Sequence, residues 1–200
     1  MFNKRLFTAA CALFLSIPLH AAPKVGEAAP GFTLTDSHNK SISLSDYTGK
    51  PVVLEWTNHE CPFVRKHYES GNMQKLQAEY TGKGAIWLSI ISSAPTKQGH
   101  VTGEEAAELT KSRGAKPSAV LLDPTGKVGQ SYNAKTTPHM FIIDGQGILR
   151  YAGGIDNIKS TDQADIKSAK NYVAQGLEEL LAGKPVSEPT TAPYGCGVKY

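Results

Sequence analysis

The run Pro51–Trp56, "PVVLEW", constrains the fold of this 200-residue chain more than any other feature. It is almost continuously apolar, and so is the later run Ala85–Ile91, "AIWLSII". A strand with one face in water shows alternating polar residues, whereas a continuous apolar run needs cover on both faces. Each run therefore predicts a central strand that lies between two layers of other elements.

Helical patterns separate these runs from further strand-like segments. Helices are expected at Pro62–Tyr80, at Thr102–Ala115 and at Ala164–Lys184, with Gly71 as a weak point or kink in the first. Additional strands are expected at 32–35, 41–44, 118–123 and in two segments of 139–153. The alternation of strands and helices predicts an α/β domain with a mixed sheet. We divide the chain into residues 1–21, a domain at 22–184 and a tail at 185–200.

Residues 1–21 have the layout of a cleaved secretory signal. Lys4 and Arg5 precede an apolar run that ends near Leu19, and small residues follow at Ala21 and Ala22. This run is short for a membrane span, so we expect a periplasmic or secreted protein without a stable span after cleavage; the alternative is an uncleaved anchor. The remaining chain carries 19 basic and 18 acidic residues without a basic cluster, which argues against nucleic acid as a partner.

Cys61 follows the strand predicted at Pro51–Trp56 and begins the next predicted helix. Ligands and reacting groups in α/β sheets tend to lie at such strand-to-helix junctions. A thiol at a helix start faces unpaired N–H groups and the positive end of the helix dipole, and both favour the thiolate. Arg65 has the spacing to reach back and add positive charge. The alternative is that Cys61 is a small apolar filler.

Two further features flank this thiol. Glu55 breaks the apolar run six residues before Cys61, and a buried, unpaired carboxylate would have a raised pKa and exchange protons near neutral pH. The alternative for Glu55 is a place in solvent or in a salt bridge. Thr137 and Pro138 precede the apolar segment "HMFII", and on general grounds a trans peptide bond is favoured between them.

These segments together resemble a known superfamily. "APGFTL", "NHECPFV" and "TTPHMFIIDGQG" are similar to segments of the thioredoxin-fold redoxins, the alkyl hydroperoxide reductase and thiol-specific antioxidant superfamily, and most of all to its exported peroxiredoxin-like branch. The resemblance covers nearly all of the chain after residue 21. It implies a thioredoxin-like three-layer fold with a central mixed sheet flanked by helices. It also implies that Cys61 is the attacking thiol, that Glu55 is the buried acid beneath it and that Pro138 is a cis-proline facing it.

The sequence departs from the family's patterns at three positions. Val64 stands where the Cys-x-x-Cys of thioredoxins has its second thiol. Leu54 and Asn58 stand where typical peroxiredoxins have proline and the peroxide-activating threonine, so that threonine is missing. We expect Asn58 and the neighbouring loop amides to steady the attacking or departing oxygen or sulfur instead.

Cys196 is the candidate for the missing second thiol. A lone attacking thiol needs a resolving partner, and Cys196 lies between two glycines in a tail that we interpret as mobile. The exported branch often ends in a similar Gly-Cys segment, and we hypothesise a Cys61–Cys196 disulfide in the oxidised protein. Closing a loop of 135 residues would contribute on the order of 4–5 kcal/mol, so the same bond is also a plausible structural staple.

Three functions are carried forward. The first is a cell-envelope thiol-dependent oxidoreductase that reduces a peroxide or exchanges protein disulfides through Cys61, with Cys196 as resolving thiol and an unidentified thiol as electron donor. The second is a non-catalytic thioredoxin-fold module that holds a peptide against Pro138, with a structural disulfide. The third is a copper site formed by Cys61 with His59 or His139, although the Cys-x-x-x-Cys of exported copper chaperones is absent. The leading function implies neither a cofactor nor a metal.

Overall fold

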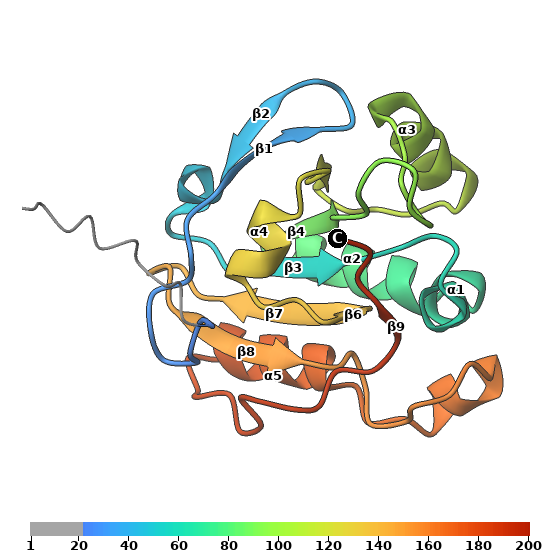
Figure 1. The fold of residues 1–200 in the computed structure, drawn as a ribbon. Coiled ribbons are helices and arrows are strands. Elements are labelled where there is room, and N and C mark those ends of the chain that lie inside the picture. Colours follow the sequence, from blue (N-terminus) through green and yellow to red (C-terminus); the bar gives the residue numbers. More distant parts are fainter. Residues whose placement is uncertain (1–21) are drawn as a thin grey trace, which may run out of the picture.

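The computed structural model describes residues 22–200, so the predicted signal segment lies outside the described residues. Its centre is a seven-stranded sheet in the order β2-β1-β5-β4-β3-β7-β8 (Figure 1). The short strands β6 and β9 form a separate pair. The strands are β1 (Thr33–Asp36), β2 (Ser41–Ser43), β3 (Val52–Trp56), β4 (Ile86–Ile91), β5 (Ala119–Leu122), β6 (Thr136–Thr137), β7 (His139–Ile143), β8 (Leu149–Gly153) and β9 (Cys196–Gly197).

The predicted mixed sheet is confirmed. Strands β3, β4 and β5 run parallel, whereas β7 pairs antiparallel with β3 and β8 pairs antiparallel with β7. At the other edge β1 pairs antiparallel with both β5 and β2. The two runs that predicted central strands are β3 and β4, which lie next to each other, and all five residues of β3 are buried.

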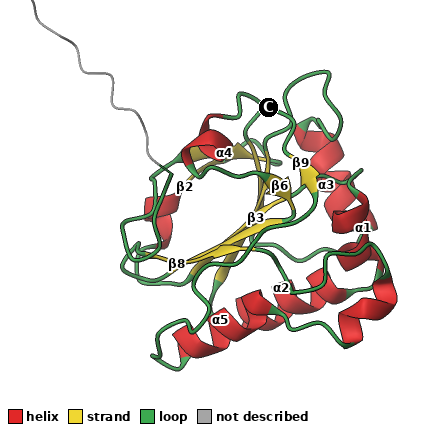
Figure 2. Ribbon diagram, turned by 60° about the horizontal axis from the view of Figure 1, so that its bottom comes forward, coloured by secondary structure: helices red, strands yellow, loops and turns green. Residues whose placement is uncertain are grey.

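Helices cover both faces of this sheet. Figure 2 shows α2 (Asn72–Gly82) and α5 (Tyr172–Leu181) on one side and α4 (Lys127–Ser131) on the other. Val53 packs in the cluster formed with α1 (Pro62–Glu69), α2 and α5. Leu54 and Trp56 pack in the opposite cluster, which includes residues of α4 and of the 3₁₀ turn η1 (Leu44–Tyr47). Cys61 belongs to the α1 cluster.

Two predicted helices have different bounds in the structure. The segment expected at Pro62–Tyr80 is divided into α1 and α2 at Gly71, whose φ of 75° is readily available only to glycine, as the expected weak point indicated. The segment expected at Ala164–Lys184 is helical in its second half only. Asn171 caps α5 by accepting from the Ala174 N–H, and a 3₁₀ turn, η2 (Gln163–Lys167), precedes it. Helix α3 (Gly103–Ser112) lies within the expected segment Thr102–Ala115, and the Thr102 hydroxyl caps it by accepting from the Glu105 N–H.

The tail, residues 185–200, lies against the domain along its length rather than apart from it. The Thr191 N–H donates to the Ala152 carbonyl, the Val198 N–H to that of Lys135, and the Lys199 carbonyl accepts from the Ala94 N–H. Figure 1 shows this red segment running from α5 to β6. The expectation of a mobile tail, which was based on its glycines and prolines, therefore differs from the structure, where long-range hydrogen bonds hold it. Within residues 22–200, no helix is both long and apolar enough to cross a membrane.

Candidate active site

Cys61 caps the N-terminus of α1, directly after the loop that leaves the carboxyl end of β3. Its N–H donates to the Asn58 carbonyl at 3.1 Å, and Pro62 occupies the first turn, where its missing N–H costs no hydrogen bond. The side chain is fully buried, and its sulfur donates to the Thr137 carbonyl at 3.0 Å. The predicted position at a strand-to-helix junction is confirmed.

The Thr137 carbonyl that accepts from this thiol lies at the end of β6, directly before Pro138 and β7. The Thr137–Pro138 peptide bond is cis. The family resemblance implied this isomer, whereas the general preference of peptide bonds favoured trans. Thr137 is buried, and its hydroxyl donates to the Cys196 carbonyl at 3.5 Å. Residues that are 76 positions apart in the chain thus meet at one sulfur atom.

Cys196 lies next to the same segment. Strand β9 pairs antiparallel with β6, and this register sets Cys196 opposite Thr137 and Gly197 opposite Thr136. The Cys196 side chain packs against the cluster that contains Cys61, and both cysteines are free thiols in this structure. The two cysteines, which the sequence places at opposite ends of the domain, are therefore side by side.

The two thiols have different acidities. Burial alone would raise the pKa of Cys61, but hydrogen bonds from the Cys196 thiol and from the N–H groups of Val64 and Cys196 outweigh it and bring the pKa below its usual value. Burial and the neighbouring Cys61 raise the pKa of Cys196 to about 11. A thiolate is the nucleophile in thiol chemistry, and of these two cysteines Cys61 is the one whose thiolate is favoured.

The Glu55 side chain is buried between β3 and the helices α1 and α2, on the face of the sheet where Cys61 packs. This confirms its predicted burial and excludes a solvent-exposed side chain. Its carboxylate accepts only from neutral groups: Tyr68 Oη at 2.8 Å, Gln77 Nε2 at 3.3 Å, Trp87 Nε1 at 2.8 Å and Ser89 Oγ at 2.9 Å. Burial raises the pKa of Glu55, and these four donors offset that effect only in part. A carboxyl with this environment can take up and release a proton at a higher pH than an exposed one.

Replacing Glu55 by glutamine is expected to change how stability depends on pH. The folded protein holds the Glu55 proton more tightly than the unfolded chain. The protonated Glu55 carboxyl therefore stabilises the folded state at pH values below about 4.3, the pKa of glutamate in the unfolded chain. This stabilisation is lost as the pH rises through the higher pKa of Glu55 in the folded protein. Glutamine does not ionise. Between these two pKa values, the free energy of unfolding of Glu55→Gln should therefore rise relative to that of the wild type by about 1.4 kcal/mol per pH unit.

Urea unfolding between about pH 4 and pH 8 measures this difference. Glu104→Gln, at an exposed position of α3, is the matched control and should follow the wild type. Parallel profiles for Glu55→Gln and the wild type would contradict the raised pKa.

Asn58 and Arg65 do not turn their side chains to the thiol. The Asn58 amide nitrogen donates to the Gln98 carbonyl at 3.3 Å, and its side-chain oxygen accepts from the Glu60 N–H at 2.9 Å. Asn58 therefore holds Cys61 through its backbone and ties this loop to its neighbour. Arg65 pairs with Glu69 at 2.7 Å on an exposed part of α1, one turn further along the helix. The i,i+4 partner, which sequence reasoning did not weigh, takes the guanidinium away from Cys61.

The sequence reasoning missed several residues that shape the site. The N–H of Val64, considered earlier only as a replaced cysteine, helps to lower the pKa of Cys61. Gly195 lies so close to β6 that a Cβ there would be 2.0 Å from the Thr137 carbonyl oxygen. The sequence shows a glycine on each side of Cys196, but only the structure shows that Gly195, and not Gly197, is the one that needs to lack a side chain. For Gly197 the nearest atom would be the Lys135 carbonyl oxygen at 4.0 Å.

The copper alternative can be compared with the same geometry. Among residues 22–200, no group of three or more His, Cys, Asp or Glu side chains is arranged to hold a metal ion. His139 packs on Phe141 with 4.4 Å between ring centroids, and its Nδ1 accepts from the Lys135 N–H at 3.2 Å. His59 lines a small cavity between α1 and α3 together with Tyr68 and Arg113. These contacts give His139 a role in packing, whereas His59 faces the cavity.

Three comparisons relate this chain to known proteins. Residues 25–152 match the model of the AhpC/TSA family. The thiol-disulfide oxidoreductase ResA of Geobacillus kaustophilus is 30% identical over 129 residues, which cover 64% of this chain and 68% of that protein. A solved structure of an uncharacterised conserved protein from the same organism superposes with a TM-score of 0.74 at 26% identity and covers 88% of this chain and 92% of that one.

A third comparison concerns the fold alone. The exposed lipoprotein thioredoxin Etrx1 of Streptococcus pneumoniae superposes with a TM-score of 0.55 at 23% identity, covering 75% of this chain and 99% of that chain. The expected thioredoxin-like arrangement of a mixed sheet between helices is confirmed. Because the family model spans more than half of the chain, including Cys61, Glu55 and Pro138, this protein belongs to the AhpC/TSA family.

Proposed function

We propose that this protein is an exported thiol-disulfide oxidoreductase in which Cys61 attacks the substrate and Cys196 resolves the intermediate. The observation that carries the proposal is the contact between a Cys61 thiol of lowered pKa and a Cys196 thiol of raised pKa across the β6–β9 pair. Relatives named as a thiol-disulfide oxidoreductase and as a thiol:disulfide interchange protein support disulfide exchange as the reaction class. The basic and apolar pattern of residues 1–21 supports export to the periplasm or outside the cell.

The reaction has two exchange steps. The Cys61 thiolate attacks one sulfur of a substrate disulfide, forming a mixed disulfide and releasing the first substrate sulfur as a thiolate, which takes up a proton. Cys196 then loses its proton and attacks the Cys61 sulfur, which releases the second substrate thiol and leaves a Cys61–Cys196 disulfide. Two electrons pass from the protein to the substrate, and an external thiol donor returns them. We assign Glu55 to proton exchange during these steps because it is a buried carboxyl of raised pKa in the same layer.

Peroxide is the second candidate substrate, because the family model that matches also describes antioxidant proteins. A peroxide would oxidise Cys61 to a sulfenic acid, which Cys196 would convert to the same disulfide with loss of water. Asn58 stands where peroxiredoxins have their activating threonine, and its side chain is committed to Gln98 and Glu60. This commitment favours disulfide exchange over peroxide reduction.

The test compares three oxidants on the same reduced protein: hydrogen peroxide, an organic hydroperoxide and an oxidised protein disulfide. Acid quenching followed by mass spectrometry measures how fast the Cys61–Cys196 bond appears. We expect the disulfide to react fastest and dithiothreitol to reverse the bond. Both thiols remaining free with every oxidant would overturn the proposal. A bond that resists dithiothreitol would favour the non-catalytic binding module with a structural disulfide.

The lowered pKa of Cys61 gives a separate prediction. The rate of Cys61 alkylation against pH should report a pKa below the free-thiol value of about 8.5. Cys196→Ala should raise this pKa because the strongest hydrogen-bond donor to the sulfur is lost. Cys196→Ser retains a hydroxyl donor and should lie closer to the wild type. Peptide mapping distinguishes the two cysteines, and identical pKa values in all three proteins would show that Cys196 does not act on Cys61.

A further inference from the structure

The tail covers the thiol on which the proposed function depends. Cys61 is fully buried, although its sulfur must meet a substrate sulfur. Tyr194 and Cys196, both from the tail, pack in the same cluster as Cys61. The Tyr194 ring also meets Phe63, the second residue of α1, edge to face with 5.8 Å between centroids. Movement of this part of the tail would uncover Cys61 on the side where Tyr194 and Cys196 pack.

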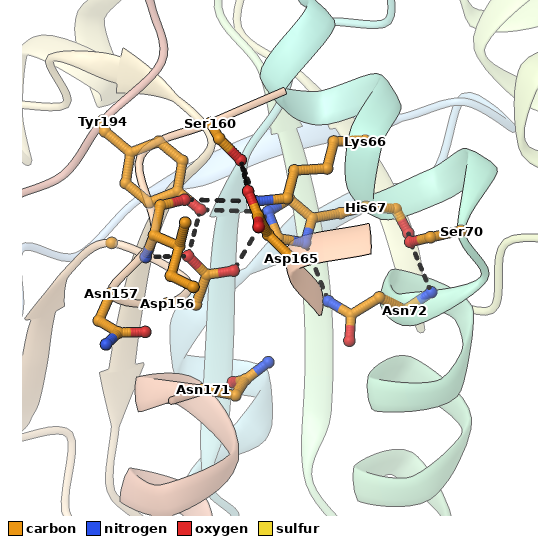
Figure 3. Close-up of polar contacts among 12 residues, drawn as sticks. Lys66, His67, Ser70, Asn72, Asp156, Asn157, Ser160, Asp165, Asn171 and Tyr194 are labelled. Atoms are coloured by element: carbon orange, nitrogen blue, oxygen red, sulfur yellow. Dashed lines mark hydrogen bonds and ion pairs between the residues drawn. The ribbon is translucent and has the colours of Figure 1, made fainter. Parts of the chain in front are cut away.

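Tyr194 is held by a buried polar network that includes neither cysteine. Its hydroxyl donates to Asp156 Oδ1 at 2.5 Å and lies 3.3 Å from His67 Nε2 (Figure 3). His67 Nε2 is in turn 3.8 Å from the second oxygen of Asp156. We call Tyr194, Asp156 and His67 the tail latch. It joins the tail to α1 and to the loop after β8.

The other contacts of the latch fix its protonation pattern. The Asn72 amide nitrogen lies 2.9 Å from His67 Nδ1, so Nδ1 accepts and Nε2 carries the ring proton. Burial lowers the pKa of His67 to about 4, so the ring is neutral at pH 7. Asp156 also accepts from the Ile158 N–H at 2.9 Å. The bond from Tyr194 to the Asp156 carboxylate is therefore a charge-assisted hydrogen bond between two side chains that are at most 6% exposed, and such bonds are among the stronger ones in proteins.

We propose that Tyr194 is a positioning residue that holds the tail closed over Cys61 through the tail latch, and that opening of the latch admits the substrate. The proposal rests on the proposed function of Cys61 and Cys196. In the closed state Cys196, the only other cysteine among the described residues, lies beside Cys61, which favours ring closure. In the open state Cys61 is available to a substrate. One side chain thus sets the balance between attack on the substrate and resolution by Cys196.

The test is the rate at which iodoacetamide alkylates Cys61 in the reduced, full-length protein. Tyr194→Phe keeps the ring and removes the hydroxyl that bonds Asp156. Loss of a hydrogen bond to a charged group is expected to make the open state about tenfold more populated, and alkylation should accelerate by the same factor. Tyr200→Phe is the matched control: it removes a tail hydroxyl that donates to the Ala134 carbonyl at 2.7 Å, beyond Cys196. Its alkylation rate should stay within about twofold of the wild type.

The urea dependence of alkylation separates the latch from a general loss of stability. Local opening exposes little surface, so rates in the wild type and in Tyr194→Phe should depend only weakly on low urea concentrations. An unchanged rate in Tyr194→Phe, an equal acceleration in Tyr200→Phe, or a steep urea dependence would each overturn the proposal. The proposed function fails on a different result, namely the absence of reversible disulfide exchange, whatever the alkylation rates.

Discussion

Replacing Cys61 by serine is expected to abolish disulfide exchange, with a loss of more than about a thousandfold in turnover. A serine hydroxyl at this position would remain protonated at neutral pH, whereas the surrounding hydrogen bonds lower the pKa of the Cys61 thiol and favour its thiolate. The measurement is turnover of an oxidised protein substrate with dithiothreitol as the electron donor. If Cys61→Ser turned over the substrate as fast as the wild type, Cys61 would not be the attacking thiol.

Cys196→Ser is the matched variant at the second thiol. It should keep the first attack and stop at the mixed disulfide, so one equivalent of substrate thiol is released per protein. Mass spectrometry of the unreduced sample should detect the substrate attached to Cys61. Full turnover in Cys196→Ser with no trapped species would show that a thiol outside this chain resolves the intermediate.

Gly195→Ala is expected to separate the two cysteines without changing either of them. A Cβ at Gly195 would lie 2.0 Å from the Thr137 carbonyl oxygen, and the φ of 144° is one that residues with a side chain rarely adopt. The chain must therefore move away from β6 and take Cys196 with it. Strained backbone of this kind costs about 1–3 kcal/mol, so the equilibrium constant for the Cys61–Cys196 disulfide should fall by roughly tenfold to a hundredfold.

Equilibration of the purified protein in glutathione buffers measures that constant. Gly197→Ala is a close control, because it adds the same methyl group on the other side of Cys196, where the nearest atom would be 4.0 Å away. We expect it to stay near the wild-type value. Equal constants for the two variants would mean that the close approach of Gly195 to Thr137 does not position the thiol.

Much of the fold was predictable from short stretches of sequence. The apolar runs at β3 and β4 indicated central strands, and Gly71 marked the division between α1 and α2. These features depend on side-chain periodicity and on the backbone freedom of single residues, which are local properties. The start of α5 was harder to predict, because the apolar pattern continues toward the N-terminal side and only the Asn171 cap marks where the helix begins.

The site was predictable only in part. Glu55 was identified because a charged residue interrupts an apolar strand, and Cys61 because a cysteine and a proline follow that strand. The cis bond at Pro138 followed from family resemblance. The direction of Arg65 was not predicted correctly, because an alternative partner at Glu69 lies on the same helix face. The four donors to Glu55 come from α1, α2 and β4, so no single segment reveals them.

The sequence by itself determined that a thiol would stand at the start of a helix after a buried strand, because a strand pattern, a cysteine and a proline occur there within a few residues. Only the tertiary structure decided that Cys196 meets it. That contact depends on the pairing of β6 with β9, on the latch at Tyr194 and on the room left by Gly195. The acidity of a buried thiol is set by the groups packed around it, and here one of them lies 135 residues further along the chain.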